Sequence, residues 1–186
     1  MAKVALVTGS TSGIGLGIAQ TLASKGCDIV INGFGDAAAI EAERANIVKT
    51  YNVRCEFVAC DITKADECEA AIASAQSKMG AVDILVNNAG IQFTSSVDQF
   101  PIDKWKSVLD TNLSGAFYLS RAVLPAMQKN DYGRIINIAS AHGLVASVNK
   151  AAYVAAKHGI VGLTKVIALE NAKQNITCNA ICPGWV

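Results

Sequence analysis

The chain carries almost no net charge and few charged residues. Its 186 residues include 16 lysines and arginines against 15 aspartates and glutamates, which leaves a formal charge of +1. A protein that binds nucleic acid by neutralising phosphates needs a clear basic excess, so this balance argues against that class. Only 17% of the residues are charged and 52% are hydrophobic, a composition that excludes an intrinsically disordered chain.

The sequence also lacks an uninterrupted apolar run of the roughly 18 residues that a membrane span needs. Its apolar start, residues 4–7, reaches a Thr-Gly turn without a cleavage-type region, so it indicates a first strand and not a signal peptide. Internal repeats, low-complexity tracts and linkers are missing as well. These features predict one domain over residues 1–186 of a cytoplasmic protein, with neither a membrane nor a nucleic acid as partner.

Histidine is scarce, and no two cysteines have the CxxC spacing. The histidines, His142 and His158, lie far in sequence from the cysteines, so we expect no metal site. A secreted disulfide framework would be shorter, with more turn residues between its cysteines. We therefore expect six reduced thiols packed as small apolar residues, at Cys27, Cys55, Cys60, Cys68, Cys178 and Cys182.

Short apolar runs alternate with longer helical stretches along the whole chain. The runs that predict strands are residues 4–7, 29–31, 55–58, 82–86, 134–138 and 176–181. The stretches with helical periodicity are residues 14–25, 37–50, 65–79, 101–127 and 151–172. Such alternation predicts a doubly wound parallel sheet of the Rossmann type, a three-layer αβα sandwich with the strand order 3-2-1-4-5-6.

A glycine-rich turn separates the first predicted strand from the first helix. Residues 8–15 read Thr-Gly-Ser-Thr-Ser-Gly-Ile-Gly, with glycines at 9, 13 and 15. Glycines at such a place allow a tight turn and a close approach to a pyrophosphate, and the helix N-terminus offers free N–H groups. The spacing is not GxGxxG, and a plain tight turn remains an alternative. The position between strand and helix favours a dinucleotide site.

The end of the second strand bears on the choice of cofactor. Residues 32–36 read Asn-Gly-Phe-Gly-Asp and contain no lysine or arginine to bind the 2′-phosphate of NADP. NAD is therefore favoured by exclusion. Phe34 would cover the adenosine, whereas Asp36 is as readily an ordinary surface turn residue.

Tyr153 and Lys157 lie four residues apart in a helical segment, which places both side chains on one helix face. An ordinary phenol is a poor acid or base at neutral pH, and a nearby ammonium favours its phenolate form. Tyrosine and lysine at this spacing also occur by chance in amphipathic helices. Three polar features converge on the pair, namely Ser140 after one strand, residues 87–90 after another, and Asn112 within a helical stretch where asparagine is a poor helix former.

Together these motifs resemble those of the short-chain dehydrogenase/reductase family. They run in the family's order through residues 8–15, Asp61, 87–90, Asn112, Ser140, Tyr153 with Lys157, and Pro183-Gly184. The resemblance implies that Tyr153 donates or accepts the proton and that Lys157 holds the nicotinamide ribose and favours the phenolate. Ser140 would polarise the substrate carbonyl, and Asn112 would anchor a proton-relay water.

The same resemblance implies NAD as the cofactor and a set of residues that contact it. These are Gly9, Thr11, Gly13, Ile14, Gly15, Phe34, Asp61, Ile62, Asn88, Ala89, Gly90, Tyr153, Lys157, Pro183, Gly184 and Val186. At the second strand the family pattern has an acidic residue or an arginine, and this chain has neither near Gly33 and Phe34.

Gln92, His142, Lys150 and Trp185 place a cation and several donors near the expected reacting centre, which suits a small carboxylate more than an acyl thioester or a steroid. Each also has an ordinary structural interpretation, such as a solvated lysine or a packed histidine. Local strings around them resemble the branch of the family that oxidises (R)-3-hydroxybutyrate to acetoacetate. By that resemblance the substrate contacts are Gln92, Ser140, His142, Lys150, Tyr153 and Trp185.

Two alternatives stay open, one of them an enzyme and the other a protein without catalytic activity. One is a 3-oxoacyl-thioester reductase or a sugar/polyol dehydrogenase of the same family, and the other is a nucleotide-sensing protein without catalysis. The resemblance further implies a homotetramer, with residues 101–127 and 151–172 in one interface.

In the family, a substrate lid, a last helix and a seventh strand follow the sixth strand. The resemblance implies that these lie beyond Val186, so we expect the 186-residue chain alone to show little activity and an association-prone sheet edge.

Overall fold

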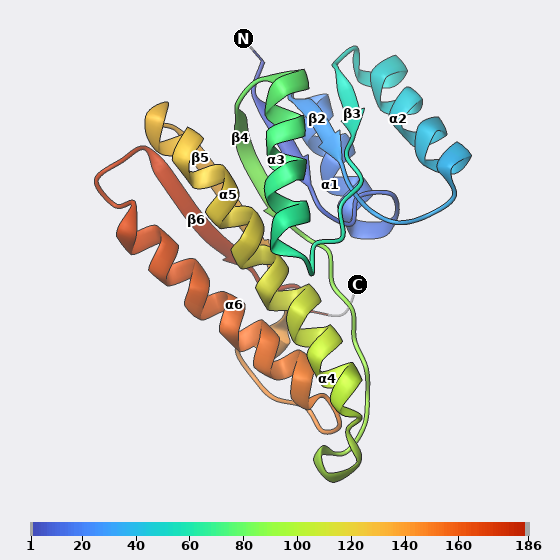
Figure 1. Cartoon of the computed structure of the whole chain (residues 1–186), viewed down its shortest axis with the longest axis vertical. Coiled ribbons are helices and arrows are strands. Elements are labelled where there is room, and N and C mark those ends of the chain that lie inside the picture. Colours follow the sequence, from blue (N-terminus) through green and yellow to red (C-terminus); the bar gives the residue numbers. More distant parts are fainter. Residues whose placement is uncertain (1, 185–186) are drawn as a thin grey trace.

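The structure is a computed structural model and describes residues 2–184. Six strands form one sheet in which every pairing is parallel and the order is β3-β2-β1-β4-β5-β6 (Figure 1). The strands are β1 (Val4–Val7), β2 (Asp28–Ile31), β3 (Cys55–Phe57), β4 (Val82–Asn87), β5 (Gly133–Ile138) and β6 (Ile176–Ile181). The predicted doubly wound fold and its strand order are confirmed.

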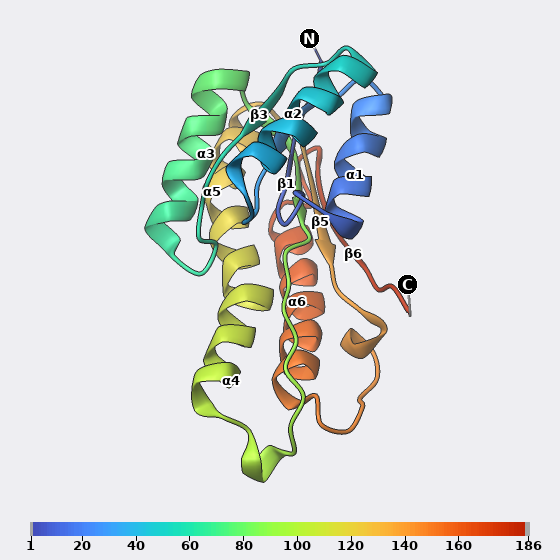
Figure 2. The ribbon, with the colours of Figure 1, turned by 90° about the vertical axis from the view of Figure 1, so that its right-hand side faces the viewer.

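Helices cover both faces of the sheet because successive strand residues point to opposite sides. The α-helices are α1 (Gly13–Ser24), α2 (Ala37–Tyr51), α3 (Ala65–Met79), α4 (Ile102–Leu109), α5 (Gly115–Lys129) and α6 (Ala151–Glu170). In β1, Val4 and Leu6 join the core beneath α3, α5 and α6, whereas Ala5 and Val7 join the core beneath α1 and α2. Figure 2 shows α3 and α5 on one side of the sheet and α1 on the other.

The stretch predicted as one helix over residues 101–127 contains a local change of winding. Between α4 and α5, Asp110–Ser114 form a π-helical turn, and the flanking Leu109 and Gly115 keep helical dihedral angles. Such a turn is rare and is often found at functional sites. Asn112 lies within it, so the polar residue that disfavoured an ordinary helix marks the place where the winding changes.

Helix α6 is the longest helix among the described residues. Its 20 residues and mean hydropathy of 1.3 would suit a membrane span by length and composition alone, a test that core helices also pass. Helix α6 packs against β6, α4 and the π-helical turn. This packing is that of a core helix, and it brings the first two turns of α6 to the ends of the strands.

Candidate active site

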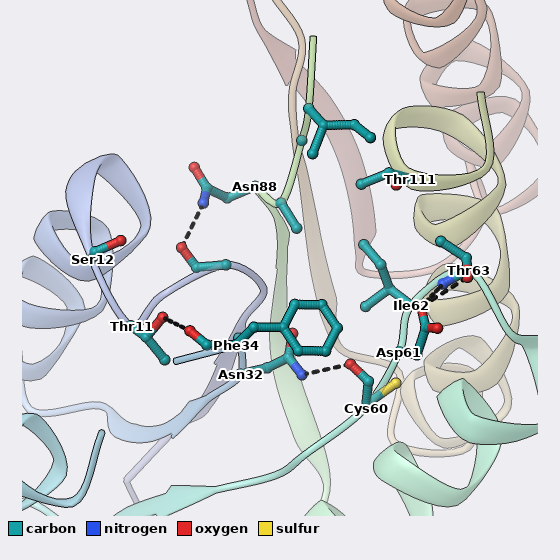
Figure 3. A pocket seen from close by; sticks show the side chains of 15 residues that line it. Thr11, Ser12, Asn32, Phe34, Cys60, Asp61, Ile62, Thr63, Asn88 and Thr111 are labelled. Atoms are coloured by element: carbon teal, nitrogen blue, oxygen red, sulfur yellow. Dashed lines mark hydrogen bonds between the residues drawn. The ribbon is translucent and has the colours of Figure 1, made fainter. Parts of the chain in front are cut away.

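Two adjoining cavities lie at the carboxyl ends of the strands, the usual ligand position in an open parallel sheet. The first, of about 310 Å³, extends from the β1–α1 loop to Asp61 (Figure 3). The second, of about 250 Å³, is lined by Ser140, Tyr153 and Lys157. Both are lined by Asn88, Gly90 and Ile91. The two cavities therefore form one elongated cleft from the second strand to the start of α6.

The floor of the cleft is held by contacts between the glycine loop and the end of β4. The Asn88 side chain donates to the carbonyl oxygens of Thr8 and Gly9, at 2.9 and 3.1 Å. The Thr8 hydroxyl accepts the N–H groups of Asn88 and Ala89, both at 3.0 Å. A Cβ atom at Gly15 would lie 2.2 Å from the Gly9 oxygen, so only glycine allows this approach.

The cleft fits a dinucleotide. Helix α1 opens beside it without an acidic residue in its first turn, and Ser12 forms no side-chain cap, so the first N–H groups of α1 are available to a phosphate. At the far end the ring of Phe34, 77% exposed, points across the cavity toward Ile62 and Asp61 (Figure 3). The hydroxyl and N–H of Thr63 hold the pKa of Asp61 below its usual range, which keeps its carboxylate charged.

Tyr153 and Lys157 lie in the first two turns of α6 and face the second cavity. The Lys157 Nζ atom lies 5.5 Å from the centroid of the Tyr153 ring and donates to the Ile138 carbonyl at 2.7 Å. Only 4% of Lys157 is exposed. Burial lowers the pKa of Lys157 to about 8, although the charge of a Cys182 thiolate would oppose the shift. The ammonium is thus held close to the phenol in surroundings that water hardly reaches.

The lowered pKa predicts a specific dependence of stability on pH. Between pH 8 and the ordinary value of 10.5, the folded protein binds fewer protons at Lys157 than the unfolded chain, so its stability rises with pH across that window. Lys157→Met removes this titration. The free energy of unfolding of the parent, relative to that variant, should increase by about 3 kcal/mol from the bottom to the top of the window. Chemical denaturation at several pH values measures it.

Lys165→Met serves as the control for that measurement, because Lys165 is exposed on the same helix. The difference in the free energy of unfolding between Lys165→Met and the parent should not change between pH 8 and 10.5. A flat difference for Lys157→Met would contradict the assigned burial of the charge.

Asn112 connects the π-helical turn to the loop after β4. Its amide nitrogen donates to the carbonyl oxygens of Ile91 and Val108, at 2.7 and 2.8 Å, and its oxygen accepts the Ile91 N–H at 3.2 Å. A Cβ atom at Gly90 would lie 2.5 Å from that oxygen and 3.7 Å from Lys157 Nζ. The asparagine therefore fixes the backbone that faces the lysine, a role that its poor helix propensity alone did not reveal.

A smaller cavity of about 140 Å³ adjoins Tyr153 and is lined by Gln92, Ser140, His142 and Lys150, together with Pro183 and Gly184. The Ser140 hydroxyl oxygen accepts the His142 N–H at 3.1 Å, and the His142 and Tyr153 rings meet edge to face at 6.1 Å. The structure thus brings together five of the six residues that the sequence suggested for substrate. The sixth, Trp185, lies outside the described residues, as does Val186.

Two of the predicted cofactor residues do not line these cavities. Gly13 takes a left-handed conformation, with φ of 56°, at the start of α1, and Gly15 packs against the loop as described above. Sequence reasoning also missed Ser95 and Asn149. The Ser95 N–H donates to the Asn149 carbonyl at 2.9 Å, and Asn149 has a positive φ of 60°. This pairing joins the loop that carries Gln92 to the residue before Lys150, and an isolated asparagine offers little signal for it.

The comparisons with known proteins agree with this geometry. The family model described as short chain dehydrogenase matches residues 3–186. The chain is 56% identical over 184 residues to a D-beta-hydroxybutyrate dehydrogenase of Cupriavidus necator, covering 99% of this chain and 70% of that protein. It is 50% identical to a protein of the same name from Rhizobium meliloti, over 100% of this chain and 72% of that protein.

A solved structure shows the same likeness in three dimensions. It is that of a variant of actinorhodin polyketide ketoreductase with NADPH, 40% identical, with a TM-score of 0.94 over 100% of this chain and 71% of that one. The sequence match and the cleft architecture lead to one conclusion. The chain belongs to the short-chain dehydrogenase family, whose oxidoreductases depend on nicotinamide dinucleotides.

Proposed function

We propose that the protein catalyses the reversible, NAD-dependent oxidation of (R)-3-hydroxybutyrate to acetoacetate. The observation that carries this proposal is the small cavity beside Tyr153, which combines Lys150 with Gln92 and His142. A cation and neutral donors opposite the reacting centre suit a carboxylate at the far end of a short chain. The names of the two relatives from Cupriavidus necator and Rhizobium meliloti support the same substrate.

The size of this cavity argues for a short substrate. About 140 Å³ lies well below the several hundred cubic ångströms of pockets that enclose large ligands. A four-carbon hydroxy acid would fit in such a space.

In the proposed oxidation, the Tyr153 Oη atom as phenolate takes the proton from the substrate hydroxyl group. The Ser140 hydroxyl holds the same substrate oxygen, and the Lys157 ammonium stabilises the phenolate before the transfer. A nicotinamide dinucleotide held in the cleft by the β1–α1 loop, Asn88 and Lys157 would supply the acceptor for the hydride of the substrate carbon. In the reverse direction Tyr153 returns its proton to the carbonyl oxygen as that oxygen gains negative charge. Lys150 anchors the carboxylate in both directions.

The choice of NAD rests on the adenosine end of the cleft. Among its described lining residues there is no lysine or arginine, and Asp61 is an anion. A 2′-phosphate at this end would meet the Asp61 carboxylate, and the nearby Lys64, 3.7 Å from that carboxylate, does not line the cavity and is already paired. We therefore expect kcat/KM to be at least about tenfold higher with NADH than with NADPH. Equal values with the two cofactors would show that another contact recognises the phosphate.

A substrate panel tests the function directly. We would compare acetoacetate with acetoacetyl-CoA by following NADH consumption, and (R)- with (S)-3-hydroxybutyrate in the oxidative direction. The proposal expects the highest kcat/KM with acetoacetate and the R enantiomer. A higher kcat/KM with the thioester would refute it and favour a 3-oxoacyl-thioester reductase.

Lys150→Ala probes the carboxylate contact. A charge-assisted hydrogen bond contributes enough that its loss should raise the KM for 3-hydroxybutyrate about 30-fold. The KM for NAD⁺ should change little, since Lys150 does not line the cofactor cavities. The matched control is Lys165→Ala at an exposed site of α6. Equal increases in both KM values would mean that Lys150 does not bind the carboxylate.

A homotetramer is part of the same proposal. Exposed apolar side chains lie on α4, α5 and α6, including Ile102, Phe117, Val166 and Leu169. Helix α4 packs against α6, and α4 continues into α5 through the π-helical turn, so we propose that a second copy covers these exposed side chains. Light scattering on the purified protein tests the state, and a monomer at micromolar concentration would contradict it. We also propose a cytoplasmic location for the enzyme.

A further inference from the structure

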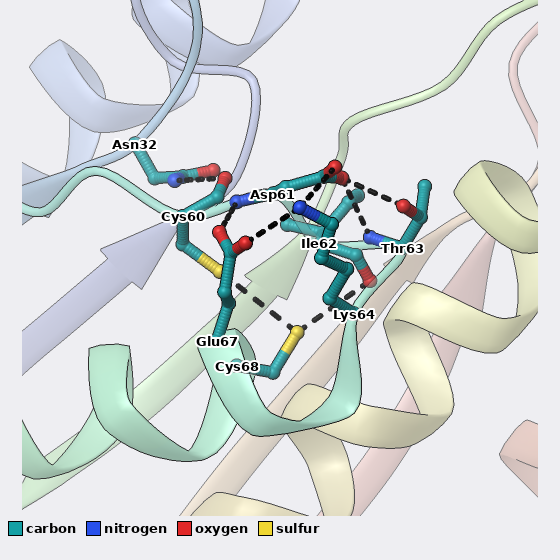
Figure 4. A network of polar contacts seen from close by, with 8 residues as sticks. All are labelled: Asn32, Cys60, Asp61, Ile62, Thr63, Lys64, Glu67 and Cys68. Carbon is teal, nitrogen blue, oxygen red and sulfur yellow. Dashed lines mark hydrogen bonds and ion pairs between the residues drawn. The ribbon is translucent and has the colours of Figure 1, made fainter.

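Two thiols face one another behind the wall of the cofactor cleft. Cys60 lies in the loop after β3, and Cys68 lies in the first turn of α3. Their Sγ atoms are 3.9 Å apart, and both residues are buried (Figure 4). Neither thiol has a part in the proposed reaction. Their distance is short enough that a modest movement of the loop would bring the sulfur atoms to bonding distance.

The thiol pair is joined to residues that line the cleft. Cys68 Sγ donates to the Ile62 carbonyl at 3.5 Å, and the Asn32 amide donates to the Cys60 carbonyl at 3.4 Å. The N–H of Asp61, next to Cys60, donates to Glu67 on α3 at 2.8 Å. Formation of a disulfide between the two sulfurs would therefore move the loop that contains Cys60. The two residues after Cys60, Asp61 and Ile62, line the adenosine end of the cleft.

The two cysteines differ in access and in acidity. Cys60 lines the first cavity, whereas Cys68 packs in the core behind it. The interaction between the two sulfur atoms lowers the pKa of Cys60, and that interaction together with burial raises the pKa of Cys68. By contrast, burial raises the pKa of Cys55 to about 12 and that of Cys178 to about 11. Cys60 is therefore the thiol of the pair best suited to react as a thiolate.

We propose that Cys60 and Cys68 are a redox modification site, at which a hydroperoxide forms a reversible disulfide that weakens dinucleotide binding. The Cys60 thiolate attacks one oxygen of hydrogen peroxide and breaks the O–O bond. This gives a sulfenic acid at Cys60 and, with the thiol proton, one water. The Cys68 thiol then attacks the Cys60 sulfur and displaces a second water. In sum, two thiols lose two electrons and two protons, and one peroxide is reduced to two waters.

The disulfide changes the cleft because its S–S bond is about 2.05 Å long. The sulfurs must approach by nearly half their present separation of 3.9 Å, and Cys60 lies in a loop whereas Cys68 is held in α3. The loop residues therefore move most, and the Cys68 bond to the Ile62 carbonyl is lost. We expect the Kd of NADH to rise about fivefold, the scale of one or two lost contacts.

The test treats the whole chain with hydrogen peroxide, with and without saturating NADH, and maps its thiols by mass spectrometry. Trypsin cleaves after Lys64 and separates Cys60 from Cys68, so the disulfide appears as two linked peptides. The first of these also contains Cys55, and fragmentation between Phe57 and Val58 assigns the bond to Cys60. We expect hydrogen peroxide to form this linkage, bound NADH to slow its formation, and dithiothreitol to reverse it. The Kd of NADH, measured by fluorescence, should rise as the linkage forms and return to its starting value after reduction.

Single substitutions separate the two roles. In Cys68→Ser, Cys60 should be oxidised further to sulfinic acid without an internal disulfide, whereas in Cys60→Ser, Cys68 should stay reduced. Cys27 and Cys178 in the parent are internal controls for general oxidation of buried thiols. Oxidation of the pair no faster than that of these controls, or equally fast with NADH bound, would overturn the proposal.

The effect of NADH on oxidation rests on the proposed cofactor. A Kd measured on the reduced protein beforehand shows separately whether NADH binds. The thiol map needs no turnover, so its result is independent of the substrate assignment.

Discussion

Tyr153→Phe should lower kcat for 3-hydroxybutyrate oxidation by about a thousandfold, the middle of the range for loss of a general acid–base. The substitution removes only the oxygen that takes the substrate proton. The remaining ring can keep its edge-to-face contact with His142 and its place near Lys157 Nζ. No other described side chain in the small cavity combines an ionisable oxygen with an adjacent buried ammonium. We therefore expect no residue to replace it.

The effect should be confined to the chemical step. The Kd of NADH and the free energy of unfolding should stay close to those of the parent, because the phenol oxygen forms no hydrogen bond with another of the described residues. Tyr132→Phe is the matched control. Tyr132 directly precedes β5, at the amino ends of the strands and away from the cleft, and its ring lies under Lys3 and Arg134. The substitution again removes only a phenol oxygen. Turnover of Tyr153→Phe within a few-fold of the parent would show that another group moves the proton.

The sequence predicted the sheet well because its strands obey a local rule. Each strand is a short apolar run bounded by turn residues, and the predicted and observed strand ends differ by at most one residue, as at Asp28 and Asn87. The π-helical turn at Asp110–Ser114 escaped prediction because its five residues are too few to show a period of their own between the helical stretches on either side. Of the two bonds that the Asn112 amide donates there, the one to Val108 spans four residues, whereas the one to Ile91 spans 21.

The candidate site shows the same division between local and distant causes. Tyr153 and Lys157 were predicted from spacing on one helix, and that relation needs no tertiary information. The position of Lys150 beside Gln92 depends on the pairing of Ser95 with Asn149, which a local pattern does not encode. The facing thiols of Cys60 and Cys68 were interpreted only as apolar filling, because their separation depends on how α3 docks against the loop after β3.

Gly15→Ala should disrupt both the fold and the cofactor cleft. The new Cβ atom would lie 2.2 Å from the Gly9 oxygen and 2.5 Å from Asn88 Nδ2, distances at which an atom must move. The Gly9 backbone is held in the left-handed region with φ of 59°, and Asn88 is bonded to that same oxygen. We expect the free energy of unfolding to fall by about 3 kcal/mol. The Kd of NADH should rise at least about tenfold, because the displaced loop is the floor of the cleft.

Gly17→Ala, two residues along the same helix, separates this steric effect from helix propensity. A Cβ atom at Gly17 meets no atom within 4 Å, so alanine should raise the free energy of unfolding by up to about 1 kcal/mol and leave the Kd of NADH unchanged. Both substitutions carry a similar gain in helix propensity, so the difference between the two variants reports the clash with the loop. Urea denaturation and NADH fluorescence titration measure the two quantities. If Gly15→Ala matched Gly17→Ala in both, the close approach of α1 to the Gly9 carbonyl would not be what shapes the dinucleotide cleft.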